Sequence, residues 1–301
     1  MKSALQLLAK VYDLGADLKN SLYDREILAS TKVKYPVLSV GNITMGGTGK
    51  TPFVDYLLKY YQTRGLRPAV VAKAYKGKVT EPTQVSLNHP EGPAYYGDEP
   101  FLLKERNPQV PIFVGANKLQ IAEYASRQGG FDFIIVDDGF QHRALYRDLD
   151  IVLIDASERV ENYQVVPAGR GRESFGTIKR ADLIAITKAH LLTQEKREFL
   201  EKSLPAQIPR VDLAYEIFRF SEAMTHKTEP LDKWVGRKVF VLAAIARPDT
   251  LTAMLREIGV EIVEVFSHRD HYQYDADDVK LILSRFRSSG GVLTDDRKRC
   301  R

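Results

Sequence analysis

The chain has 301 residues, 44% of them hydrophobic and 28% charged, and this composition excludes wholesale disorder, collagen and coiled coil. Lys and Arg total 44 against 39 Asp and Glu, so a net charge of +5 favours anionic partners such as nucleotide, phosphate or anionic lipid; without a long basic block, no nucleic acid is expected. The single Cys300 excludes an internal disulfide and a cysteine-ligated metal centre, and no apolar stretch approaches the ~20 residues of a membrane-spanning helix.

The first 28 residues predict an amphipathic helix rather than a signal peptide, because charged residues interrupt any apolar core. The apolar face comprises Leu5, Leu7, Leu8, Val11, Tyr12, Leu14 and Leu18, and the basic residues Lys2, Lys10, Lys19 and Arg25 lie elsewhere on the surface. By pattern alone, a helix packed on its own domain is favoured over a helix on a membrane surface.

Short β-rich runs then alternate with helical segments, which predicts an α/β fold with a wound, mostly parallel sheet. The expected strands are residues 37–41, 69–73, 111–115, 133–137, 151–155 and 183–187. After an irregular stretch, a second α/β pattern has strands at 238–244, 261–266 and 291–294 and helices at 248–258 and 276–287. We therefore expect a P-loop domain at 1–205, a linker at 206–236 and a smaller α/β domain at 237–301.

A glycine-rich loop lies between the first expected strand and a helix. It reads Thr44-Met45-Gly46-Gly47-Thr48-Gly49-Lys50-Thr51, and we call these eight residues the phosphate loop. Glycines allow successive N–H groups to turn around a phosphate; Lys50 would reach the β and γ phosphates, and the Thr51 hydroxyl would ligate Mg²⁺. The alternative, a purely structural glycine turn, is less favoured because the strand, loop and helix occur in the order that a P-loop requires.

Two adjacent acids, Asp137 and Asp138, end the apolar run 133–136. A strand of this kind delivers its carboxylates to the carboxyl edge of the sheet, where ligands bind in open α/β folds. Adjacent acids repel one another unless a cation offsets their charge, and Mg²⁺ held with Thr51 would do so. A turn with a helix cap is the plainer interpretation of the same two residues.

Several separate strings resemble the tetraacyldisaccharide 4′-kinases of lipid A biosynthesis. They are Ser39-Val40-Gly41-Asn42 before the phosphate loop, Gly97-Asp98-Glu99-Pro100, Asp137-Asp138-Gly139-Phe140-Gln141-His142-Arg143, Arg147-Asp148-Leu149-Asp150, Pro167-Ala168-Gly169, Arg172-Glu173, Arg180-Ala181-Asp182, Ala246-Arg247-Pro248 and Asp270-His271-Tyr272. The resemblance spans about residues 22–274. In two places Lys stands where the family commonly has Arg, at Lys73 and at Lys118, and Lys lacks the bidentate fork of Arg.

The resemblance implies transfer of the ATP γ-phosphate to the 4′-hydroxyl of an acylated glucosamine disaccharide 1-phosphate, giving lipid IVA. It also implies two α/β/α domains with the active site between them, and peripheral contact with the anionic cytoplasmic face of the inner membrane. The N-terminal helix is associated with membrane contact in this family, which reverses the preference drawn from pattern alone. The sequence gives no expectation of the oligomeric state.

Four residues resemble the family's catalytic set. Asp98 corresponds to the base that accepts the hydroxyl proton, helped by His271 from the second domain, while Arg172 and Glu173 correspond to a pair near the phosphates and the metal. From the residues alone, Asp98 is equally well explained as a helix N-cap, His271 as a surface histidine, and Arg172 with Glu173 as a solvated ion pair.

Two other classes of function fit part of the pattern. A P-loop ATPase or GTPase switch needs only the phosphate loop and the acidic strand end, without Asp98 or His271. A membrane-surface nucleotide-binding protein without lipid kinase activity is the third possibility. The segment Thr187-Lys188-Ala189-His190 lacks the Asp of guanine-specific switches, which disfavours GTP.

Overall fold

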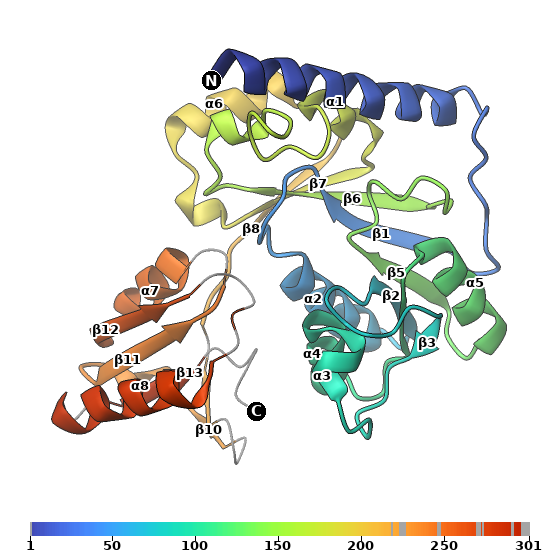
Figure 1. Ribbon diagram of the computed structural model, residues 1–301. Helices are drawn as coiled ribbons and strands as arrows, with labels where there is room; N and C mark the ends of the chain where they lie inside the picture. The colour runs from blue at the N-terminus through green and yellow to red at the C-terminus, as the bar shows by residue number, and fades with distance from the viewer. Residues whose placement is uncertain are drawn as a thin grey trace. The chain divides into compact units, whose positions relative to one another are not determined.

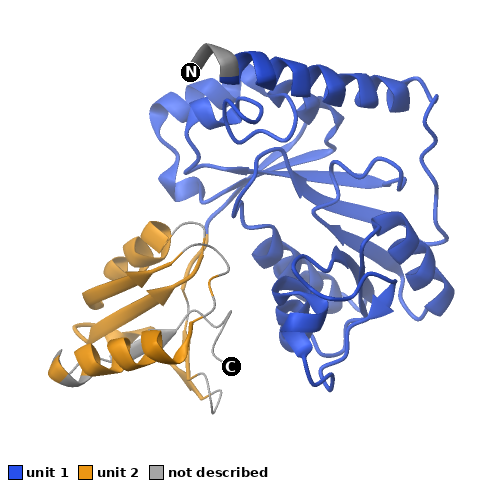
Figure 2. Cartoon of the chain, in the orientation of Figure 1, with its two compact units in different colours: residues 1–214 blue, residues 215–301 orange. Residues whose placement is uncertain are grey.

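The chain forms two compact units, residues Met1–Ala214 and Tyr215–Arg301 (Figure 2). The computed structural model describes residues 2–217, 219–222, 227–245, 248–268, 272, 274–289 and 292–295. The division between the units falls within the segment 206–236, and each unit is described by itself.

An eight-stranded sheet forms the centre of unit 1 (Figure 1). Its strands are β1 (Val37–Asn42), β2 (Pro68–Lys73), β3 (Thr83–Gln84), β4 (Ile112–Gly115), β5 (Phe133–Asp137), β6 (Leu149–Asp155), β7 (Leu183–Thr187) and β8 (Arg210–Leu213). Their order is β3-β4-β2-β5-β1-β6-β7-β8, and every pair is parallel except β3 with β4. The predicted wound, mostly parallel sheet is confirmed; the short β3 and the edge strand β8 have no counterpart in the prediction.

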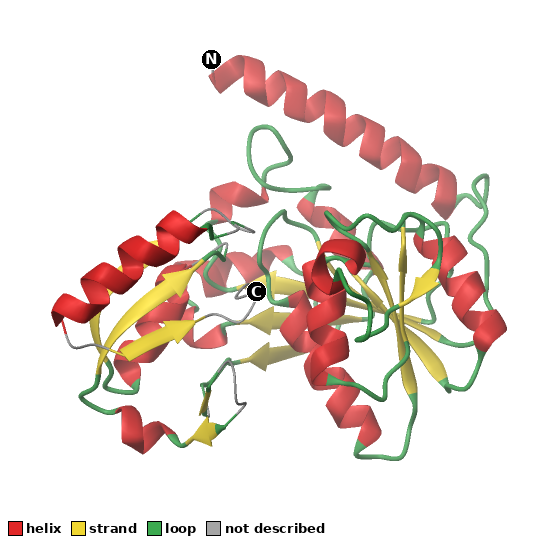
Figure 3. Cartoon of the chain, turned by 60° about the horizontal axis from the view of Figure 1, so that its bottom comes forward, coloured by secondary structure: helices red, strands yellow, loops and turns green. Residues whose placement is uncertain are grey.

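Helices connect the strands and cover both faces of this sheet. They are α1 (Lys2–Asp24), α2 (Lys50–Gln62), α3 (Gly92–Tyr96), α4 (Asp98–Arg106), α5 (Lys118–Gln128) and α6 (Gln194–Ser203), with 3-10 turns at Val160–Tyr163, Phe175–Arg180 and Ala189–Leu191. In Figure 3, helices (red) lie on both sides of the strands (yellow) of unit 1. Within the described part of the chain, no helix is long and apolar enough to cross a membrane.

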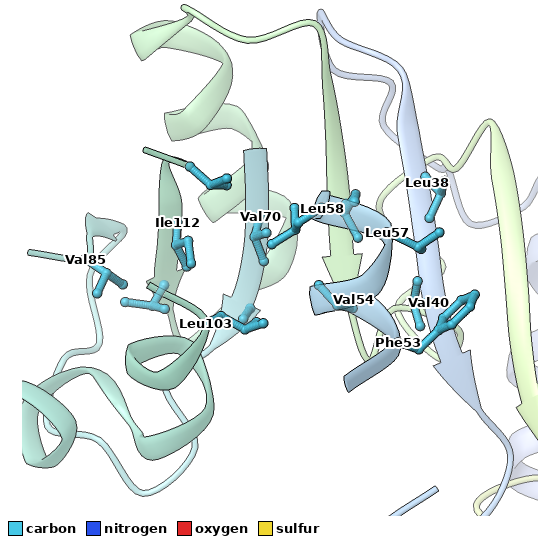
Figure 4. Packing of buried hydrophobic residues seen from close by; sticks show 14 of the residues in the cluster. Leu38, Val40, Phe53, Val54, Leu57, Leu58, Val70, Val85, Leu103 and Ile112 are labelled. Carbon is cyan, nitrogen blue, oxygen red and sulfur yellow. The ribbon is translucent and has the colours of Figure 1, made fainter. Parts of the chain in front are cut away.

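The alternation of side chains along each strand divides the core into two layers. In β2, Val70 packs in one cluster with Leu58 of α2 and Leu103 of α4 (Figure 4), whereas the next residue, Val71, packs on the other side with Ile121 of α5. Since both faces of the sheet are covered, its central strands are apolar along nearly their whole length.

The strand order places the two predicted ligand-binding loops next to each other. β1 lies between β5 and β6, and Val40 of β1 is in register with Asp137 at the end of β5. Because the two strands are parallel, the phosphate loop after β1 and the acidic pair at the end of β5 leave the sheet at the same edge.

Unit 2 has a parallel three-stranded sheet in the order β12-β11-β13, so the predicted second, smaller α/β domain is confirmed. Its elements are a hairpin of β9 (Phe220–Ser221) and β10 (Thr228–Glu229), a 3-10 turn at Leu231–Trp234, β11 (Lys238–Ala243), α7 (Pro248–Glu257), β12 (Glu261–Ser267), α8 (Ala276–Ser289) and β13 (Val292–Asp295). Trp234, Val239, Val241 and Leu255 are buried at its core.

Candidate active site

The phosphate loop makes a closed turn between β1 and α2. Gly46 (φ +114°) and Gly49 (φ +88°) adopt the left-handed backbone region that other residues avoid. Inside the turn, Asn42 Nδ2 donates to Thr44 O at 2.6 Å and to Thr48 Oγ1 at 2.9 Å. The side chain of Asn42 therefore holds the loop from within, and α2 begins directly after Gly49 with its N-terminal amides at the end of the loop.

Main-chain contacts from other loops brace the outside of the turn. Met45 N–H donates to Arg170 O at 2.7 Å, and Arg172 N–H donates to Ile43 O, also at 2.7 Å. On another side, the hydroxyl of Thr187, at the end of β7, donates to Thr48 O at 2.9 Å. These contacts hold the loop from two sides.

Asp138 lies at the centre of a cluster of positively charged side chains. Lys50 Nζ lies 3.4 Å from Asp138 Oδ1, and Arg172 Nη1 donates to both carboxylate oxygens at 2.8 Å. Lys118 Nζ donates to the main-chain oxygen of Asp138. Burial by itself would raise the pKa of this carboxyl, but Lys50, Lys118 and Arg172 together hold the pKa of Asp138 well below its ordinary value. Asp138 is therefore ionised throughout the physiological range.

Asp137 lies in the opposite electrostatic situation. Its carboxyl is buried, and burial together with the nearby carboxylates of Glu99 and Asp138 raises the pKa of Asp137 to about 7. Among the described residues, its Oδ1 atom has no hydrogen-bond partner. The charges of Lys50 and Lys118 only partly offset this rise, and Mg²⁺ would supply further positive charge at the unpartnered Oδ1 atom.

The residues predicted to bind metal fit Mg²⁺ by their chemistry. Thr51 is in the first turn of α2, Asp137 is the last residue of β5, the neighbour of β1, and Asp138 follows it. In the described ranges, no group of three or more His, Cys, Asp or Glu side chains could hold a metal. A site here would draw on a hydroxyl and one or two carboxylates, which suits a cation that keeps several waters and takes further oxygens from phosphates.

The side chains of the predicted pair, Arg172 and Glu173, contact different parts of the structure. Arg172 joins the Asp138 cluster, whereas Glu173 accepts from Arg180 Nη2 at 2.9 Å and from Asn20 Nδ2, on α1, at 2.8 Å. Glu173 is buried, so neither its position nor its partners are those of a solvated ion pair with Arg172. Its proposed role near the phosphates stays a prediction.

Asp98 is the first residue of α4 and follows Gly97, which occupies the N-cap position with φ +90°. The neighbouring Glu99 lies close enough to Asp137 to raise its pKa, so the Gly97–Pro100 segment is near the acidic strand end. His271 and Asp270 lie outside the described residues, and the predicted assistance of Asp98 by His271 stays a prediction.

A small cationic pocket beside Asp138 was not predicted from the sequence. Lys73, Lys118 and His142 line this cavity of about 120 Å³. Burial lowers the pKa of Lys118 to about 8, and burial with the charges of Lys118 and Lys73 lowers the pKa of His142 to about 3, so the imidazole is neutral at pH 7. The sequence did contain a signal for this pocket. Lys73 ends β2, and Lys118 begins α5 shortly after β4, so both lysines lie at the carboxyl edge of the sheet.

The doubly wound sheet, the phosphate loop between β1 and α2, and the acidic end of the adjacent β5 define a P-loop nucleotide-binding α/β protein. The family model described as "Tetraacyldisaccharide-1-P 4′-kinase" (LpxK) matches residues 1–301, and this chain belongs to that family. The resemblance found in the sequence is thereby confirmed.

Curated relatives and a solved structure agree with this assignment. The tetraacyldisaccharide 4′-kinase of Bdellovibrio bacteriovorus is 43% identical over 289 residues, which cover 96% of this chain and 85% of that protein. The enzyme of the same name from Halothermothrix orenii is 34% identical, over 93% of this chain and 77% of that protein. The crystal structure of LpxK from Aquifex aeolicus in complex with ATP superposes with a TM-score of 0.74 at 26% identity, covering 99% of this chain and 88% of that one.

We predict that Gly41→Ala destabilises unit 1 at the base of the phosphate loop. A Cβ at position 41 would lie 2.5 Å from Phe140 Cβ and 2.8 Å from Phe140 N, so β1 and the turn after β5 would have to separate. We expect the free energy of unfolding to fall by about 1–3 kcal/mol, the usual cost of overpacking. Urea unfolding followed by circular dichroism measures it, with Gly176→Ala as control because a Cβ there meets nothing within 4 Å. Equal midpoints for the two variants would contradict the prediction.

Proposed function

We propose that this protein transfers the γ-phosphate of ATP to the 4′-hydroxyl of an acylated glucosamine disaccharide 1-phosphate, giving lipid IVA in lipid A biosynthesis. One observation carries the proposal: Lys50 of the phosphate loop and Arg172 converge on Asp138 at the carboxyl edge, in a chain of the tetraacyldisaccharide-1-P 4′-kinase family. The names of the relatives in Bdellovibrio bacteriovorus and Halothermothrix orenii supply the acceptor.

In this proposal the phosphate loop binds the triphosphate. The main-chain amides of residues 44–51 and the N-terminus of α2 surround the phosphates, and Lys50 neutralises charge on the β and γ groups. Thr51, Asp137 and Asp138 hold Mg²⁺. When bound, this ion offsets the negative charge of the phosphates as the terminal group is transferred. The closed, braced form of the loop supports this assignment, since a loop held by its own hydrogen bonds loses less entropy on binding a ligand than a loop without them.

The transfer step needs a group that takes the proton of the attacking hydroxyl. Asp98 has this role in the proposal, with His271 assisting and Arg172 stabilising charge on the phosphates. Two features support Asp98: α4 presents its first residue directly after Gly97, and the adjacent Glu99 is near Asp137. Glu173, which also contacts Asn20 of α1, is the residue proposed to act beside Arg172 near the phosphates and the metal.

The acceptor is an anion, and the cationic pocket beside Asp138 suits its polar head. Lys73 and Lys118 both line the pocket, and both stand where Arg is common in the family. At both positions this chain has a compact ammonium group in place of the bidentate fork of the Arg that the resemblance implies. The neutral His142 adds a donor or acceptor for a sugar hydroxyl.

The way α1 is held supports peripheral contact with an anionic membrane surface. Near its C-terminal end, α1 is attached by polar contacts: Arg143 Nη2 is 2.7 Å from Asp24 Oδ1, and Asn20 donates to Glu173. Along the rest of the helix, which Figure 3 shows on the outer side of unit 1, seven large apolar side chains stay exposed, Leu14 at 71% and Leu7 at 65% among them. An exposed apolar face flanked by lysines is typical of a helix that lies in the membrane interface.

The direct test incubates the purified chain with ATP, Mg²⁺ and the acylated disaccharide 1-phosphate and analyses the lipid by mass spectrometry. A product heavier by one phosphate supports the proposal. Lys50→Ala should abolish the product, whereas Lys59→Ala, on the exposed far end of the same helix, should not. Steady ATP hydrolysis with unmodified lipid would instead support an ATPase switch.

We predict that Asp98→Ala separates ATP binding from phosphoryl transfer. Loss of the proton acceptor should lower kcat by about 100-fold or more, while the dissociation constant for ATP changes little. Glu105→Ala, an exposed acid on the same helix, is the matched control. A kcat for Asp98→Ala equal to that of the control would show that the base is another residue.

We predict that Leu7→Ser with Leu14→Ser weakens binding to anionic phospholipid vesicles about 10-fold or more, because two exposed leucines no longer enter the interface. The control is Leu66→Ser with Leu87→Ser, which changes two exposed leucines of unit 1 outside α1. Vesicle co-sedimentation at fixed salt measures the effect. If both double variants partition like the unchanged chain, α1 is purely structural.

A further inference from the structure

The guanidinium of Arg170 lies directly against the phosphate loop. A Cβ built on Gly46 would be 2.1 Å from Arg170 Nη2 and 3.1 Å from its Cζ, so the arginine occupies the space beside the middle of the loop. The backbone of Arg170 is also fixed to this loop, because its oxygen accepts from Met45 N–H at 2.7 Å. Both the main chain and the side chain of Arg170 therefore contact the loop.

A buried acid holds the other edge of the guanidinium. Arg170 Nη1 lies 3.5 Å from Glu158 Oε2, and the Glu158 side chain is only 4% exposed. Glu158 is itself positioned by Asn162, whose Nδ2 donates to Glu158 Oε1 at 2.5 Å. The main-chain oxygen of Asn162 also accepts a hydrogen bond from the N–H of Arg170 at 2.8 Å. The three residues form a closed arrangement whose outward-facing member is the arginine, with 40% of its side chain exposed.

We propose that Arg170 is a further nucleotide-phosphate-binding residue, a third cation at the loop in addition to Lys50 and Arg172. The inference rests on the proposed binding of ATP at this loop. Glu158 orients the guanidinium through Nη1, and the N–H groups on the Nη2 side donate to phosphate oxygens held by the loop.

Electrostatics favours this role over a purely structural one. Lys50 and Arg172 both contact Asp138, whose carboxylate offsets part of their charge before nucleotide arrives. Arg170 lies on the same segment as Arg172, but its guanidinium lies against Gly46 and adds positive charge at the middle of the loop. A guanidinium has five donors in a planar fork, and one ion pair with Glu158 leaves donors for a phosphate in the same plane.

The test measures the affinity of the full chain for Mg²⁺ complexes of ATP and for AMP by calorimetry. Arg170→Gln should raise the dissociation constant for ATP about 10-fold or more, the range expected for the loss of a charge-assisted hydrogen bond. The dissociation constant for AMP should rise by less than about twofold. Arg170→Lys should recover part of the loss because charge is kept without the fork. The control is Arg127→Gln, at the C-terminal end of α5 and therefore at the opposite edge of the sheet.

A second variant separates binding from folding, since Arg170→Gln also removes the ion pair between Arg170 and the buried Glu158. The double variant Arg170→Gln with Glu158→Gln removes both charges. It should recover thermal stability, while its affinity for ATP should stay as low as that of Arg170→Gln. If the double variant binds ATP within about twofold of the unchanged chain, or if ATP and AMP weaken equally, Arg170 only braces the loop and the inference is wrong. If the unchanged chain itself does not bind ATP, the proposed function fails.

Discussion

The pairing of one half-buried carboxylate with two cations from different segments is the interaction on which the site depends. Asp138 brings together Lys50, from the start of α2, and Arg172, from a loop 34 residues further along the chain. Removing the carboxylate of Asp138 would leave Lys50 and Arg172 partly buried and without this compensating charge, which destabilises the folded chain. The cluster therefore stabilises the fold and at the same time concentrates positive charge where phosphates bind.

The strands and the phosphate loop could be predicted because their signals are local. A buried parallel strand is a short apolar run, and the glycines at 46 and 49 are required by the backbone angles of the turn itself. β8 was missed because Arg210–Leu213 is a partly exposed edge strand without a continuous apolar run. An edge strand is specified by the neighbour that it pairs with, which its own sequence does not record.

The partners of charged side chains could not be predicted for a related reason. Arg172 and Glu173 are adjacent in sequence, yet one reaches Asp138 and the other reaches Arg180 and Asn20. The cationic pocket could not be predicted for the same reason. Lys73 and Lys118 are brought together by the order of the strands in the sheet, which the sequence near each lysine does not specify. The amphipathic pattern of the first helix likewise defines an apolar face without specifying what covers it.

Residues 170–173 connect three parts of unit 1 that the sequence analysis treated separately. Their main chain pairs with residues 43–45 of the phosphate loop, Arg172 holds the acidic turn after β5, and Glu173 contacts α1. Successive residues of one short segment thus contact the parts proposed to bind nucleotide, metal and membrane. A displacement of this segment would disturb all three at once. The buried Glu173 and Glu158, each paired with an arginine, help to hold it in place from within the domain.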